Sequence, residues 1–173
     1  MHPRRSEERS RPLRDRGGAG CVRLAGAYHH RDEAVKIAIT LLVVVHLVAT
    51  LWHGDAHSTL EVFLPALKNL FIYTVILAGP VVGAILVWTR FFILGAGLVA
   101  VSMTGALVFG VYHHYILVSP DNIAHLPAGT AAAHAQFIDS AALIAIIELV
   151  SALYAFYALG QARAAESPRL SHG

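Results

Sequence analysis

Histidine is the residue type in this chain that is best suited to chemistry. The chain has 11 histidines, and a group of them flanks one end of its apolar segments. Neutral imidazole is the commonest metal ligand in proteins, and it also binds haem iron. The pattern therefore predicts a metal or haem site near that end of the segments, drawn from His53, His57, His113, His114, His125 and His134.

Two of these histidines have the spacing of paired metal ligands. His53 and His57 are four residues apart, so on a helix they share a face and can bind one ion. His113 or His114 can supply a third nitrogen, and we expect His113 because it shares a helical face with small residues. His134 can supply a fourth nitrogen. A glycine, Gly54, threatens this arrangement, because it can end the helix between the pair.

Oxygen atoms complete the predicted ligand set. Glu61 and Asp121 are candidate oxygen ligands, or acceptors of the second N–H of a ligating histidine. A nitrogen and oxygen set suits Zn, Cu(II) or Fe. The chain has one cysteine, Cys21, and only two methionines, which excludes a disulfide framework, a thiolate-rich zinc site and a methionine-rich copper site.

A single haem b is the alternative cofactor. His53 and His113 resemble the histidine pair that four-helix membrane cytochromes use to hold haem between facing helices, often beside small residues. Such cytochromes generally bind a second haem at the opposite end of the bundle. The apolar segments have no histidine at that end, so the resemblance implies at most one haem.

Two further polar residues lie near the middle of apolar segments. His46 and Glu148 are at similar depth, and Thr50 is on the same helical face as His46. Ionisable groups at membrane depth are costly, and they mark functional sites by default. We expect a contact between Glu148 and His46 or Thr50, which either tunes protonation beneath the histidine cluster or serves as structural glue with a neutral carboxyl group.

The composition predicts helices that cross a membrane. Hydrophobic residues make up 56% of the 173 residues and charged residues 14%, and the mean hydropathy is +0.59. Soluble domains have about 25% charged residues, and a spanning helix needs roughly 20 mainly apolar residues. We therefore expect an all-α fold, an antiparallel four-helix bundle in the lipid bilayer over residues 34–160, with spans at about 34–56, 65–89, 91–115 and 135–160.

The charge distribution predicts the orientation of this bundle. Most of the 13 basic residues lie in the first 36 residues, and others lie at Arg90, Arg163 and Arg169. The positive-inside rule then places both termini in the cytoplasm (N-in/C-in) and the histidines at the outer face of the inner or plasma membrane. Residues 1–33 are expected to be a disordered basic arm, and residues 161–173 a cytoplasmic tail. Nothing in the pattern favours nucleic acid as a partner.

A role without chemistry is the competing hypothesis. Gly79 and Gly83 form a small-xxx-small pair that lets helices approach closely. The chain would then be a structural or accessory four-span subunit that binds another membrane protein or a second copy of itself. Ser58 and Glu61 match a capping box that begins a new turn, and Pro65 is expected in the first turn of the second span.

Overall fold

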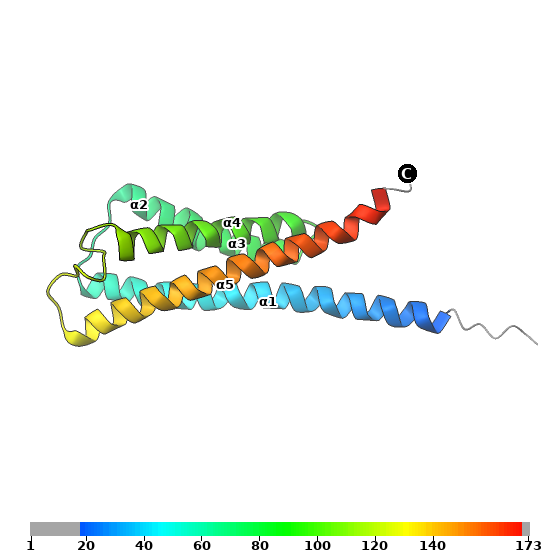
Figure 1. The fold of residues 1–173 in the computed structure, drawn as a ribbon, viewed down its shortest axis with the longest axis horizontal. Coiled ribbons are helices and arrows are strands. Elements are labelled where there is room, and N and C mark those ends of the chain that lie inside the picture. The colour runs from blue at the N-terminus through cyan, green and yellow to red at the C-terminus, as the bar shows by residue number, and fades with distance from the viewer. Residues whose placement is uncertain (1–17, 171–173) are drawn as a thin grey trace, which may run out of the picture. The chain divides into compact units, whose positions relative to one another are not determined.

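The computed structural model describes the backbone of residues 18–170 and the side chains of residues 32–164. All regular structure within this range is helical, which confirms the predicted all-α class (Figure 1). The elements in chain order are α1 (Gly18–Thr59), α2 (Ala66–Phe71), the π-helix η1 (Ile72–Ala78), α3 (Gly79–Leu86), α4 (Phe92–Val111), the π-helix η2 (Tyr112–Ile116) and α5 (Ala131–Leu170).

The chain divides into two compact units, Met1–Ala34 and Val35–Gly173. Of the arm that we expected to be disordered (residues 1–33), residues 1–17 lie outside the described residues, but the chain is helical from Gly18 onward. Helix also extends through most of the predicted C-terminal tail, to Leu170. The candidate site described below lies within the second unit.

Four helices are long and apolar enough to cross a membrane. They comprise Asp32–Thr59, Ala66–Leu86, Phe92–Ile116 and Ala131–Ala164, with mean hydropathy between 2.0 and 2.3. Many large apolar side chains on these helices are exposed, among them Leu51, Leu70 and Leu153. Such a surface is what lipid tails solvate and water does not.

Small residues bring α3 and α4 into close contact. A Cβ atom added to Gly83 would lie 2.9 Å from the carbonyl oxygen of Gly95, and one added to Gly79 would overlap the Ser102 side chain. The Gly79/Gly83 pair therefore packs two helices of the same chain. The backbones approach so closely only because these positions have no side chain.

The second span is irregular before its proline. The N–H of Gly79 bonds to the carbonyl of Thr74, five residues earlier, as in a π-helix. Pro80 follows at the start of α3, where its missing N–H and its ring disrupt the regular α-helical pattern. The π-helical turns of η1 therefore lie directly before the proline.

The end of α1 differs from the sequence prediction. Ser58 does not cap a new turn: it is still within α1, and its hydroxyl donates to the carbonyl of Gly54. Glu61 has a φ of 53°, and the bonds from Glu61 N to Ser58 O and from Val62 N to His57 O form a Schellman motif that ends the helix. Pro65 immediately precedes α2, as its N-cap.

Two clusters of buried apolar residues stabilise the bundle. The larger consists mainly of small and branched side chains of α1, α3, α4 and α5, with Met103 at its centre. The smaller lies at the end of the bundle that holds the predicted site, and it comprises Ala56, Leu60, Val62, Ala133 and Phe137. This second cluster packs the start of α5 and the chain after α1 around the histidines.

Candidate metal centre

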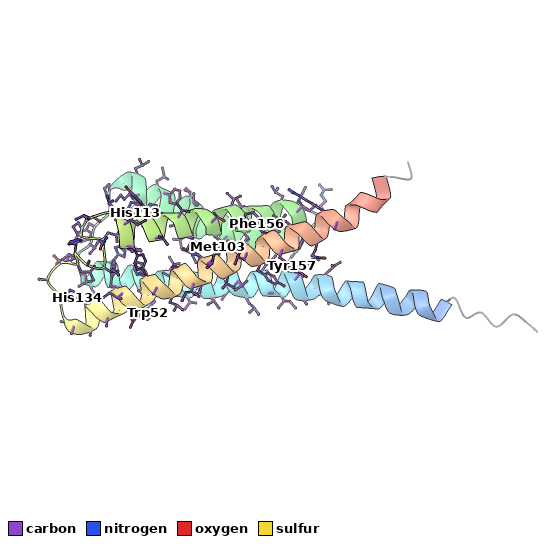
Figure 2. The ribbon with its side chains drawn as sticks, in the orientation of Figure 1. Trp52, Met103, His113, His134, Phe156 and Tyr157 are labelled. Atoms are coloured by element: carbon purple, nitrogen blue, oxygen red, sulfur yellow. The ribbon has the colours of Figure 1, made fainter. Side chains whose placement is uncertain are left out.

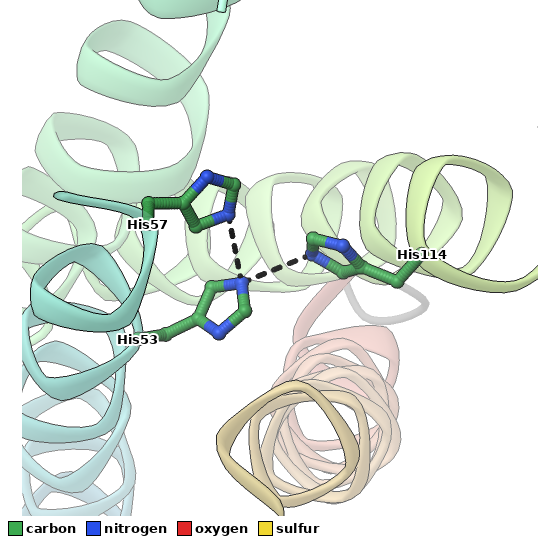
Figure 3. A group of neighbouring side chains, drawn as sticks. All are labelled: His53, His57 and His114. Carbon is green, nitrogen blue, oxygen red and sulfur yellow. Dashed lines mark hydrogen bonds between the residues drawn. The ribbon is translucent and has the colours of Figure 1, made fainter. Parts of the chain in front are cut away.

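Three histidine rings point toward one another at one end of the bundle (Figure 3). The Nε2 atom of His53 lies 3.1 Å from Nε2 of His57 and 3.2 Å from Nε2 of His114. One ligand nitrogen from each ring lies within 4.8 Å of the others. These are the nitrogens that a shared metal ion would bind.

Two helices carry the three rings. His53 and His57 lie one turn apart on α1, which continues through Gly54 to Thr59, so the glycine does not break the pair. His114 belongs to η2, the π-helical end of the third span. His53 is 8% exposed and His114 is 9% exposed, so the cluster is largely shielded from solvent.

Backbone carbonyls determine which nitrogen of two rings carries the hydrogen. Nδ1 of His57 lies 3.2 Å from the carbonyl oxygen of Val62, and Nδ1 of His114 lies 2.9 Å from that of Asp121. A carbonyl oxygen can only accept, so both Nδ1 atoms are donors. In a neutral imidazole the remaining nitrogen, here Nε2, then has a lone pair.

The third ring is oriented by a hydroxyl group of α5. The Ser140 hydroxyl donates to the Gln136 carbonyl at 2.6 Å, so it accepts a hydrogen bond from Nδ1 of His53 at 2.8 Å. In the neutral ring, Nε2 of His53 therefore also carries a lone pair. When all three rings are neutral, their Nε2 lone pairs face one another, and either a shared proton or a metal cation placed there relieves their mutual repulsion.

The spacing of the nitrogens fits a small metal ion. With Zn–N bonds of about 2.0–2.1 Å and tetrahedral angles, two ligand nitrogens lie about 3.3 Å apart. The separations from Nε2 of His53 to the other two Nε2 atoms, 3.1 and 3.2 Å, are close to that value, and all three ligand nitrogens lie within 4.8 Å of one another. Ligating histidines typically donate their other N–H to a carboxylate, a carbonyl or water, and here all three Nδ1 atoms have such an oxygen acceptor.

Asp121 places a carboxylate beside the cluster. Its Oδ1 lies 3.3 Å from Nε2 of His57 and 3.2 Å from Nδ1 of His114, yet neither approach has hydrogen-bond geometry. Burial raises the pKa of this carboxyl group, but the neighbouring His114, His57 and His53 lower it more, so the net pKa is below its usual range. A buried, ionised carboxylate with free lone pairs is a suitable oxygen ligand.

Phe137 closes one side of the cluster. Its ring centroid lies 4.8 Å from those of His53 and His57 and 5.4 Å from that of His114, and the residue is fully buried. Neither Phe137 nor Ser140 was predicted from the sequence pattern, and the only signal for Ser140 is a hydroxyl group within the fourth apolar segment. Both are core positions of α5 that orient or shield the rings.

The third histidine of the cluster is His114, whereas the sequence favoured its neighbour. The ring of His113 packs on Phe109, with centroids 4.1 Å apart, and its Nδ1 donates to the Phe109 carbonyl. The small residues that share its face, Gly95 and Ser102 among them, contact α3. The small-residue face therefore marks the contact between α3 and α4. The face that carries Gly110 and His114 is the one that lines the cavity beside the site.

The other predicted ligands lie apart from the cluster. His134 donates from Nε2 to the carbonyl oxygen of Pro127 at 2.8 Å, and on α5 it precedes Ser140 by about 9 Å of helix rise. Figure 2 labels it near the start of α5, away from His113. His125 is exposed on that loop, and Glu61 is exposed at the helix end.

The geometry does not fit the haem alternative. The ring neighbours of His53 are His57, His114 and Phe137, so it is not paired with His113. The cavity beside the cluster measures about 70 Å³. That volume holds only a few water molecules, and a porphyrin is far larger.

A second polar contact lies deeper in the bundle. Nε2 of His46 is 3.2 Å from Oε1 of Glu148 and 3.4 Å from the Thr50 hydroxyl. His46 is fully buried and Glu148 is 2% exposed. The structure thus brings together the two ionisable residues that the sequence places at mid-span, directly below the histidine cluster.

No known protein family, curated protein or solved structure matches this chain. The geometry of the site is therefore the basis for its chemistry.

Proposed function

We propose that this chain is an integral membrane protein that binds one divalent transition-metal ion, Zn, Cu or Fe, through Nε2 of His53, His57 and His114. The observation that supports this most strongly is the convergence of three Nε2 lone pairs whose Nδ1 partners are all oxygen acceptors. Asp121 is the fourth candidate ligand. The positive-inside rule favours an outer-face site with both termini in the cytoplasm.

This ligand set narrows the role of the ion. Three imidazoles with one carboxylate or open position are typical of zinc sites that keep a position for water or substrate. Of the three histidines, His57 is the most exposed, and a lateral groove between α1 and the second span reaches both His53 and His57. A small ligand can therefore approach the ion from that side of the bundle.

The test is metal analysis of the purified chain, expressed with zinc, copper and iron available. We expect about one equivalent of a single metal per chain, lost in His53→Ala and retained in His134→Ala, the matched control at the same end of the bundle. A well-folded wild-type protein that binds none of these metals would instead favour the accessory-subunit hypothesis, and the next experiment would be to identify its membrane partners.

A further inference from the structure

A small cavity connects the histidine cluster with the middle of the bundle. Its lining includes His53, His57, His114 and Asp121 of the cluster together with Thr50 and Glu148. The rest of the lining consists mainly of apolar side chains of the second, third and fourth spans. Its volume of about 70 Å³ leaves room for a few water molecules.

Glu148 has one oxygen that only this cavity can satisfy. Oε1 contacts His46, but Oε2 is buried and has no hydrogen-bond partner among the described residues. Unsatisfied buried oxygens are rare in native proteins, because most buried oxygens form a hydrogen bond to protein or to an ordered water molecule. Since Glu148 lines the cavity, water there is the natural partner of Oε2.

Gly110 leaves the passage between the two ends open. A Cβ atom at this position would lie 3.9 Å from Oε2 of Glu148 and 3.9 Å from Cδ2 of His114. The space that a side chain at residue 110 would fill therefore borders both the carboxyl group and a ring of the cluster. Any larger residue would narrow the connection.

We propose that the Glu148–His46 pair is the internal proton-exchange group of the histidine site, and that it releases one proton through the cavity past Gly110 when a divalent cation binds. This inference rests on the proposed metal-binding function. The O–H bond of Glu148 breaks, and the proton passes to water in the cavity. No electron is transferred.

The electrostatics favour this coupling. With its shared proton the pair is neutral, as an uncompensated charge at mid-span is costly. A dication nearby in a medium of low dielectric stabilises a negative charge on the pair. The titratable groups nearest Glu148 are His46 from α1 and His114 from η2. His53, His57 and Asp121 also line the cavity. The residues of the second span that line the cavity are all apolar.

The first experiment counts protons. Zn²⁺ is titrated by calorimetry into the full chain in lipid nanodiscs, in buffers of different ionisation enthalpy, which gives the protons released per ion bound. We expect Glu148→Gln to bind Zn²⁺ with unchanged stoichiometry and to release up to one proton fewer, whereas Glu148→Asp keeps the wild-type count. If Glu148→Gln does not fold, His46→Gln provides the same comparison.

The second experiment tests the route. Gly110→Ala places a methyl group at ordinary contact distance, so the variant should fold, and Zn²⁺-induced proton release, followed with a pH indicator by stopped flow, should slow several-fold. Gly97→Ala, on the same helix with nothing within 4 Å of its added Cβ, is the matched control and should behave as wild type.

The outcomes separate the two proposals. An unchanged proton count in Glu148→Gln and His46→Gln, with Zn²⁺ bound, would overturn the proton-exchange role and leave the metal site in place. Equal release rates in Gly110→Ala and wild type would overturn the route. If the wild-type chain does not bind Zn²⁺ or another divalent transition metal, both the metal site and this inference are wrong.

Discussion

Nε2 of His53 lies 3.2 Å from Nε2 of His114, and in the neutral rings neither atom carries a hydrogen. Two acceptors at that distance repel each other unless a proton or a metal cation lies between them. The orientation of the rings is not accidental, because each is held by an oxygen acceptor at Nδ1. Changing the groups that hold these rings in place should therefore change the affinity for metal.

Ser140 orients His53, so removing its hydroxyl should weaken metal binding. Loss of a residue that orients a ligating histidine typically costs about 10–100-fold in metal affinity, and we expect that loss in Ser140→Ala, measured as Kd for Zn²⁺ by competition with a chelator. Ser151→Ala is the control, because the buried Ser151 hydroxyl on the same helix has no hydrogen-bond partner among the residues that the structure describes. Equal affinities in the two variants would show that Ser140 does not position the ring.

Asp121 contributes the negative charge of the site. Asp121→Asn keeps the shape of the side chain and the backbone carbonyl that orients His114, but it removes the charge beside His57. We expect Zn²⁺ affinity to fall about 10–100-fold, measured by the same competition assay. Asp139→Asn removes the same charge from an exposed position of α5 and should have no effect. A similar loss in both variants would indicate a general electrostatic effect.

Gly95 should be irreplaceable in the contact between α3 and α4. A Cβ there would lie 2.7 Å from both the Gly83 carbonyl oxygen and the Val87 nitrogen, which are backbone atoms and cannot move aside cheaply. Overpacking of this kind costs about 1–3 kcal/mol. Gly95→Ala should therefore lower the free energy of unfolding in detergent, whereas Gly97→Ala should not. A wild-type unfolding curve for Gly95→Ala would mean that the two helices are less closely packed.

Glu61 adopts a left-handed conformation at the end of α1, so glycine should stabilise the chain there. A non-glycine residue in this region costs about 1–2 kcal/mol, and Glu61→Gly should recover about 1 kcal/mol in the free energy of unfolding. Glu61→Ala removes the carboxylate but keeps the Cβ atom, so it should give no gain. Both variants should bind metal normally, since Glu61 is exposed and outside the cluster. Weakened metal binding in both variants would indicate that Glu61 is a metal ligand.

The helical class and the four apolar helices were predictable because they depend on composition and segment length. The contact between Glu148 and His46 also followed from depth and helical phase alone, since both residues lie near the middle of regular helix.

The choice between His113 and His114 was not predictable in the same way. Small residues on the His113 face correctly indicated a helix–helix contact, but they do not say which helix is the partner. The acceptors that orient the rings, Val62 and Asp121, lie in loops, and their positions depend on the Schellman turn after α1 and on the fold of the loop after η2. Those are tertiary features that no helical periodicity encodes.

The most direct test of the account compares two neighbouring histidines. His113→Ala and His114→Ala remove the same group one residue apart, both from buried positions. The metal content of each purified variant is measured beside wild type. We predict that His114→Ala loses the bound ion and that His113→Ala retains about one equivalent. Loss in His113→Ala with retention in His114→Ala would contradict the assigned site.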